Sequence, residues 1–125
     1  MFVRDFIHVA RPFESVAPRF VADATWLDHG GAVRCDSGPV RVRHDSLVVP
    51  LTITTSGAGA VPELEADLEV SPLGPTLCQL TLSATYRRAA AAGTDDALAQ
   101  RAAEVVARAF LQAVAERITA DEQPA

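Results

Sequence analysis

The chain has 125 residues, of which 49% are hydrophobic, so it is long enough to bury one core, and it has no apolar run of the length that a membrane-spanning helix needs. Its net charge of −5 makes it poorly suited to hold the phosphate backbone of a nucleic acid. Residues 1–9 carry charge inside their apolar run and lack the basic start and cleavage pattern of a signal peptide. We therefore expect one cytoplasmic domain over residues 1–125, with no nucleic-acid partner and no membrane span.

The N-terminal third combines a strand with helical spacing. Residues 2–9 alternate between apolar and polar side chains, which predicts a strand. Pro12 suits the first position of a helix, and apolar residues follow it at helical spacing. Because Pro18 interrupts that spacing, we predict two short helical pieces with a bend between them. Residues 23–31 hold the only tryptophan, Trp26, and end in a sequence typical of a loop.

The middle of the chain predicts about five antiparallel strands. These cover residues 32–36, 40–43, 47–55, 63–70 and 76–88. Pro50 lies opposite the apolar row of its strand, which indicates an edge position or a bulge. Residues 71–75 contain two prolines and a glycine, so we predict a turn there. In the strand over residues 63–70 one row is apolar and the other acidic, which indicates one buried face and one solvated face. We expect the acidic row, Glu63, Glu65, Asp67 and Glu69, to deter association between sheet edges.

The last segment, residues 94–119, has the longest helical pattern. Thr94 is a suitable N-cap, and at 1.5 Å per residue the helix would be roughly 36 Å long. The predicted apolar face consists of Leu98, Ala102, Val105, Val106, Ala109, Phe110, Ala113, Val114 and Ile118. Such a helix needs an apolar surface of its own length, and the inner faces of the strands can provide it. We therefore expect an α+β fold in which a curved antiparallel sheet of about six strands wraps around the C-terminal helix, with a loose tail after residue 120.

Three stretches of this sequence resemble a known superfamily. They are the strand-to-helix entry ARPFESV (10–16), the strand and turn LEVSPLG (68–74), and the strand LTLSATY (80–86) that precedes the long helix. Together with the order of elements, they resemble small bacterial members of the START-like superfamily, also called SRPBCC, whose fold is the helix-grip. Members of that superfamily bind lipids, sterols, polyketides or hormones between sheet and helix, and some act as cyclases or aromatases.

The resemblance implies an apolar cavity between the sheet and the C-terminal helix. The candidate lining residues are Trp26, Val49, Leu51, Leu68, Leu80, Leu82, Tyr86, Val106 and Phe110. A small apolar ligand would bind there, with the Tyr86 hydroxyl or backbone groups orienting its polar end. For Trp26 and Tyr86 the alternative is core packing, which is the commoner role of such residues. Two other functions stay open: a structural or partner-binding domain with a filled core, and a cyclase-like enzyme.

The polar residues predict no catalytic or metal site. Among the histidines, His8 lies on the polar face of the first strand, His29 lies in a loop, and His44 lies in a hairpin turn. None has a second metal ligand at a suitable spacing, so we expect no metal and no cofactor. Cys35 and Cys78 are far apart in the sequence, and we expect both to be reduced and buried.

Overall fold

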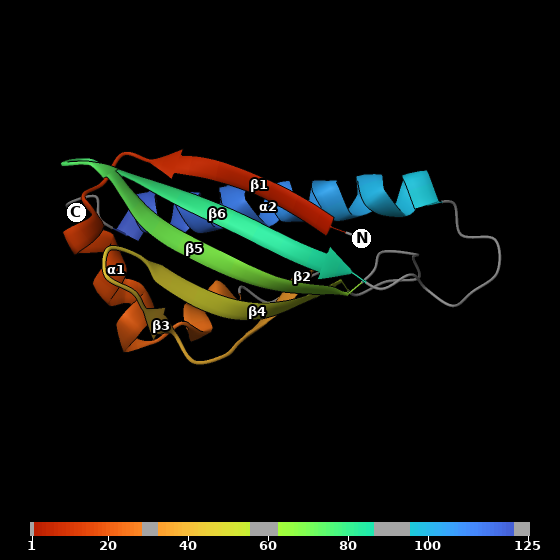
Figure 1. Cartoon of the computed structure of the whole chain (residues 1–125), viewed down its shortest axis with the longest axis horizontal. Helices are drawn as coiled ribbons and strands as arrows, with labels where there is room; N and C mark the ends of the chain where they lie inside the picture. The colour runs from red at the N-terminus through yellow and green to blue at the C-terminus, as the bar shows by residue number, and fades with distance from the viewer. Residues whose placement is uncertain (1, 29–32, 56–62, 87–95, 122–125) are drawn as a thin grey trace.

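The computed structural model of the chain describes residues 2–28, 33–55, 63–86 and 96–121. Within these residues, the long helix α2 covers one face of a six-stranded sheet, and α1 lies near one end of the sheet (Figure 1). The elements in chain order are β1 (Phe2–Val9), α1 (Phe13–Ala22), the 3-10 helix η1 (Thr25–Leu27), β2 (Val33–Ser37), β3 (Arg41–Val42), β4 (Leu47–Thr55), β5 (Leu64–Gly74), β6 (Leu77–Tyr86) and α2 (Asp96–Asp121). Several features of the sequence analysis lie outside the described residues: His29, Thr94 and all of the predicted tail beyond residue 121.

The sheet has the strand order β1-β6-β5-β4-β2, and β3 also pairs with β4. Each of these pairs is antiparallel. On the inner face, which lies against the helices, Leu68 pairs with Val49 on one side and Leu82 on the other. α2 runs mainly along β1 and also approaches β6, while α1 approaches β5 and η1 approaches β2. This architecture confirms the predicted α+β fold of a curved sheet and a long C-terminal helix.

β4 and β5 are interior strands, which corrects two predictions about edges. Pro50 pairs with Asp67 in a regular ladder, and not at an edge or a bulge. On its other side, β4 pairs with β2 from Leu51 onward and with β3 at Leu47 and Val48. The strand accepts this proline because Pro50 lies in the gap between β2 and β3. The Pro50 carbonyl accepts a hydrogen bond from the Gly38 N–H at 2.8 Å across this gap, and the N–H that proline lacks would point the same way.

The acidic row of β5 is exposed, as predicted, but it does not protect an edge. Glu65 and Asp67 are solvent-exposed side chains on the outer face. Because β5 lies between β6 and β4, its backbone groups pair on both sides. The acidic row therefore affects what can approach the outer face of the sheet, and the predicted role in deterring edge-to-edge association is wrong.

The turn between β5 and β6 is shorter than the predicted 71–75. β5 continues to Gly74, and only Pro75 and Thr76 form the turn. A register shift between Pro72 and Gly74 places an extra residue in β5, so the strand stays paired with β6 past Pro72. The bulge explains how a sequence rich in proline and glycine remains part of the strand.

α1 is one continuous helix, so the predicted bend at Pro18 is wrong. Val16 and Phe20 lie on either side of Pro18, and both are fully buried in the core. Burial of this shared face keeps the two halves in line. Without an N–H on Pro18, the carbonyl of Glu14 loses its helical partner, but Glu14 is exposed and water can hydrogen-bond to that carbonyl.

α2 buries a face that is rotated from the predicted one. Leu98 and Val105 were predicted to face the sheet, but they are 65% and 63% exposed, and Ala109 is also exposed. Leu111, which was not predicted, is fully buried. The buried residues of α2 are Ala99, Ala103, Val106, Ala107, Phe110, Leu111, Val114 and Ile118. Alanines occur on several sides of this helix, so its apolar band is broad and tertiary packing selects the buried part. Among the helices that the structure describes, none combines the length and the apolar character that crossing a bilayer requires.

Candidate functional site

The inner face of the sheet brings most of the predicted lining residues together. Val49, Leu51, Leu68, Leu80, Leu82, Tyr86, Val106 and Phe110 belong to one buried core cluster. They come from β4, β5, β6 and α2, so the sheet faces the helix as predicted. Val49, Leu68, Leu80 and Leu82 are each 0% exposed, so water does not reach these side chains and the apolar layers are in close contact.

Trp26 lies at the periphery of this cluster. It belongs to η1 and is partly buried against the core. Its ring centre lies 5.2 Å from that of Phe20, and the Arg19 guanidinium lies 4.7 Å above the indole. The indole N–H donates to the Arg19 carbonyl at 3.0 Å. These contacts with α1 fix the position of the ring.

A polar cluster closes one end of the apolar layer. The Tyr86 hydroxyl donates a hydrogen bond of 2.6 Å to Oε1 of Gln100 on α2. The Gln100 side-chain amide in turn donates to the Phe2 carbonyl at 3.2 Å and to the Glu104 carboxylate at 3.1 Å. The sequence analysis did not include Gln100 among the candidate site residues. The spacing of four residues between Gln100 and Glu104 was visible in the sequence. The position of Gln100 beside β1 was not, because α2 buries a different face from the predicted one.

A salt bridge next to this cluster holds α2 against β1. Asp5 lies on the inner side of β1, paired with Leu82 of β6. Its two carboxylate oxygens accept from Nη2 and Nε of Arg108, each at 3.0 Å. Arg108 also lies 3.5 Å from the Phe6 carbonyl, at the limit of a hydrogen bond. Paired contacts between arginine and carboxylate are geometrically specific, so they help to set the position of the helix along the strand.

Neither of the two histidines that the structure describes belongs to a cluster that indicates catalysis. His8 lies on the outer face of β1, where its Nε2 is 3.2 Å from the Gln79 amide oxygen. His44 is exposed in the connection between β3 and β4, in agreement with the predicted hairpin. Among the described residues, no three His, Cys, Asp or Glu side chains are placed to hold a metal ion.

The two cysteines are buried and are not bridged to each other. The Cys78 thiol donates to the Arg11 carbonyl at 3.2 Å. Burial, with smaller contributions from the nearby carboxylates of Asp28 and Asp36, raises the pKa of the Cys35 thiol from 9.0 to about 12. Cys35 is therefore a protonated, weakly reactive core residue at neutral pH.

This raised pKa predicts a loss of stability in alkaline solution. Above pH 9.0 the unfolded chain loses the Cys35 proton, whereas the folded chain keeps it up to about pH 12. The free energy of unfolding should therefore fall as the pH rises across this interval. Below pH 9.0 both states keep the Cys35 proton, so this loss of stability is absent. Cys35→Ala should reduce the slope of stability against pH by at most about 1.4 kcal/mol per pH unit. Urea denaturation at pH values on both sides of 9.0 measures the slopes, and equal slopes would contradict the assignment.

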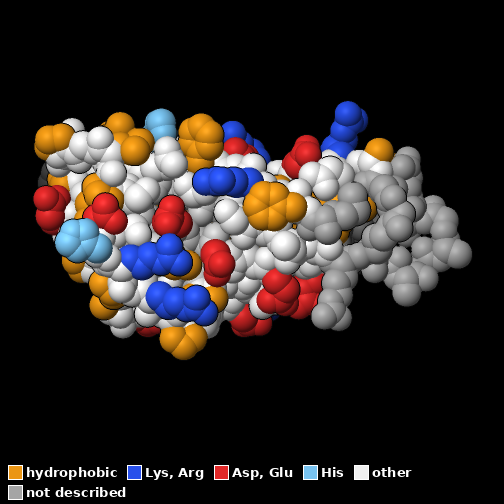
Figure 2. Space-filling view, in the orientation of Figure 1, with side chains coloured by type: hydrophobic (Ala, Val, Ile, Leu, Met, Phe, Trp, Pro, Cys, Tyr) orange, Lys and Arg blue, Asp and Glu red, His pale blue; other side chains and the backbone are white. Residues whose placement is uncertain are grey.

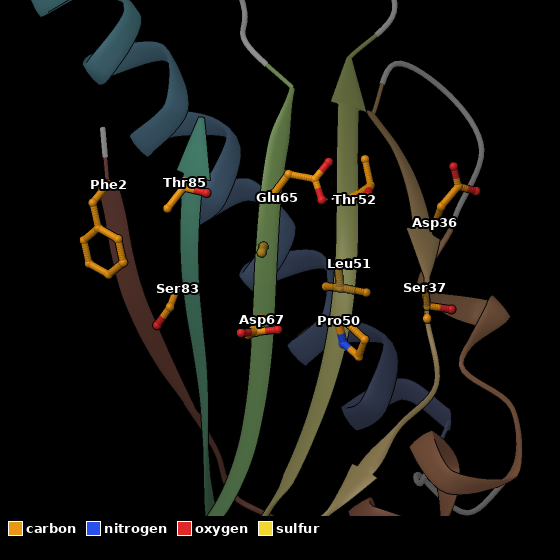
Figure 3. A pocket seen from close by; sticks show the side chains of 12 residues that line it. Phe2, Asp36, Ser37, Pro50, Leu51, Thr52, Glu65, Asp67, Ser83 and Thr85 are labelled. Atoms are coloured by element: carbon orange, nitrogen blue, oxygen red, sulfur yellow. Dashed lines mark hydrogen bonds between the residues drawn. The ribbon is translucent and has the colours of Figure 1, made fainter. Parts of the chain in front are cut away.

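A hollow of about 580 Å³ lies on the outer face of the sheet, on the side away from α2 (Figure 3). Its floor is formed by β4, β5 and β6, and Phe2 and Asp36 lie at opposite sides. The other polar side chains that line it are Ser37, Thr52, Glu65, Asp67, Ser83 and Thr85. The sequence predicted a solvated face for this part of β5 and β6. It missed the hollow because alternation identifies which residues face outward but not how the sheet curves.

Comparisons with known proteins identify the fold. No protein-family model and no curated protein matches the sequence. The structure is similar to that of the Zhui aromatase/cyclase from Streptomyces sp. R1128, with a TM-score of 0.55 and 15% identity over 95% of this chain and 93% of that one. It is also similar to a START superfamily protein from Mycobacterium smegmatis, with a TM-score of 0.54 and 13% identity over 94% of this chain and 97% of that one. Matches at such identities show the fold alone, and the fold is START-like, as the sequence predicted.

Proposed function

We propose that this chain binds a small, mostly apolar molecule between the inner face of the sheet and α2. One observation carries the proposal: the candidate lining is aliphatic or aromatic, and its single hydroxyl, that of Tyr86, lies at one end beside Gln100. An apolar layer with one polar group at its end suits a ligand with one polar end. The START-like fold supports this function, and the similarity to an aromatase/cyclase supports including aromatic compounds among the ligands to test.

Binding requires part of α2 to move, because the apolar layers are in close contact. The first half of the helix loses less apolar burial when it moves, and its polar contacts from Gln100 and Arg108 to β1 would have to break. It buries the alanines Ala99, Ala103 and Ala107, whereas the second half buries larger side chains such as Leu111 and Ile118. Small side chains lose little apolar burial when they separate from the sheet. We place the polar end of the ligand at the same end of the helix, where it would meet Tyr86 and Gln100.

The second candidate function is a partner-binding domain whose core is already filled. The complete burial of Val49, Leu68, Leu80 and Leu82 favours it. The two candidates differ in one measurable property: only the first predicts that an apolar small molecule stabilises the protein by binding inside it.

A matched pair of substitutions on α2 tests the ligand site. Val106 faces the sheet and is 9% exposed, whereas its neighbour Val105 is 63% exposed. Fatty acids, sterols and aromatic polyketides would be screened by thermal shift and by native mass spectrometry. We expect at least one compound to bind and to stabilise the wild type, by about 2.7 kcal/mol at a hundred times its Kd. Val106→Phe should abolish this effect because the larger ring occupies the ligand space, and Val105→Phe should preserve it.

The outcomes separate the two candidates. If the whole panel leaves the melting temperature and the native mass of the wild type unchanged, the filled core is the better description. If a compound stabilises wild type and both variants equally, it binds elsewhere, and the proposed site between sheet and helix is wrong.

A further inference from the structure

The outer face of the sheet carries two rows of side chains with complementary properties. On β1, Arg4 lies between Phe2 and Phe6, and the two aromatic side chains are 56% and 53% exposed. On β5, two strands away, acidic side chains occupy the outer row. Figure 2 shows this face: acidic side chains follow β5, and basic and hydrophobic side chains lie along β1. Among the described residues, neither Arg4 nor Asp67 forms an ion pair.

The register of the strands aligns these two rows. Phe2, Arg4 and Phe6 pair with Thr85, Ser83 and Thr81 of β6, in that order. The same three residues of β6 pair with Glu65, Asp67 and Glu69 of β5. β6 therefore lies midway between an aromatic and basic row and an acidic row, and it carries only hydroxyl side chains between them.

We propose that this face is a self-association surface, on which a second copy of the chain docks face to face. A two-fold axis that runs over β6, parallel to the strands, places β1 of each copy over β5 of the other. The rotation leaves positions along the strands unchanged, so Arg4 faces Asp67 of the second copy, and Asp67 faces its Arg4. Two ion pairs form, and Ser83 and Thr85 of the two copies lie near the axis.

The charges exclude the other face-to-face arrangement. A two-fold axis perpendicular to the strands would place β5 over β5 and bring the two acidic rows together, and like charges in contact oppose association. The parallel axis also agrees with the way sheets pack, with strand directions within about 30° of each other. Charge complementarity therefore selects one geometry and one occupant, a second copy of the same chain.

The hollow on this face matches the same geometry. Its floor includes Glu65 and Asp67, the positions over which the second copy would place Phe2 and Arg4. A volume of about 580 Å³ leaves room for side chains of the second copy to enter. The strands that take part cover roughly 500 Å² on each copy, or about 1,000 Å² in total, which is near the lower limit of specific interfaces. The dimer should therefore dissociate on dilution.

Charge reversal at the two paired positions tests the proposal. Arg4→Glu places acidic groups at both positions, and Asp67→Arg places basic groups at both, so each variant alone should dimerise about tenfold or more weakly than the wild type. An equimolar mixture of the two restores both ion pairs and should recover the wild-type Kd. Sedimentation equilibrium measures these constants, and circular dichroism confirms that each variant is folded. Arg101→Glu, on the exposed side of α2, is the control and should leave the dimer unchanged.

Three results would overturn the proposal: a wild type that stays monomeric at the highest concentration reached, single reversals that leave the Kd unchanged, or a mixture that dimerises no better than its components. Added salt gives an independent measurement. It should weaken the wild-type dimer, because exposed ion pairs are screened. A dimer insensitive to salt would contradict the paired charges.

Discussion

Replacing Leu111 with alanine should lower the free energy of unfolding by about 2–5 kcal/mol. Leu111 is fully buried in α2, so the substitution removes apolar burial and leaves a cavity against the sheet. Leu98 provides a matched control on the same helix, because it is 65% exposed. Leu98→Ala should stay within about 0.5 kcal/mol of the wild type. Urea denaturation of the three proteins, analysed with a common slope, measures the difference.

The same pair of variants decides between two orientations of the helix. The sequence pattern placed Leu98 on the inner face and did not include Leu111 there. If Leu98→Ala is the more destabilising substitution, α2 presents the face that the pattern predicted. Equal midpoints would mean that neither leucine is anchored in the core.

Phe20→Ala should be as severe, with a loss of about 3–5 kcal/mol. Phe20 is fully buried in α1, which approaches β5. The adjacent Val21 is 54% exposed, so Val21→Ala is the control and should change stability by no more than about 0.5 kcal/mol. Trp26 lies 5.2 Å from the Phe20 ring, so the fluorescence of the chain's only tryptophan follows the same transition.

A small effect of Phe20→Ala would show that α1 contributes little to the core. In that case burial could not be what keeps the helix continuous through Pro18. Separate fluorescence and circular dichroism transitions would lead to the same conclusion, because they would show that α1 unfolds before the sheet.

Much of the fold could be predicted because strand alternation reports burial directly. In β4, β5 and β6 each side chain faces either helix or solvent, so Leu68 and Leu82 could be assigned to the inner face from their parity alone. A helix with many alanines lacks this clarity. The apolar band of α2 is wider than its buried face, and only packing against β1 selects Leu111 over Leu98.

The rest of the candidate site depends on contacts between distant parts of the chain. Gln100 meets Tyr86 and the Phe2 carbonyl only after α2 has packed beside β1. Pro50 is accepted inside the sheet because of a gap between two other strands. Neither arrangement leaves a periodic signal in the local sequence. The polar end of the apolar layer was therefore only partly predictable, through Tyr86.

The position of α2 beside β1 also limits how the sheet can grow. An outermost strand offers unpaired backbone groups to which a strand from another chain can add. Gln100 donates to the Phe2 carbonyl of β1, and Arg108 reaches the Phe6 carbonyl four residues further along. A strand added sideways at β1 would have to displace these side chains of α2. The chain's own helix thus opposes ribbon-like extension of the sheet at β1. In the face-to-face dimer proposed above, by contrast, an assembly of two would be closed and could not propagate.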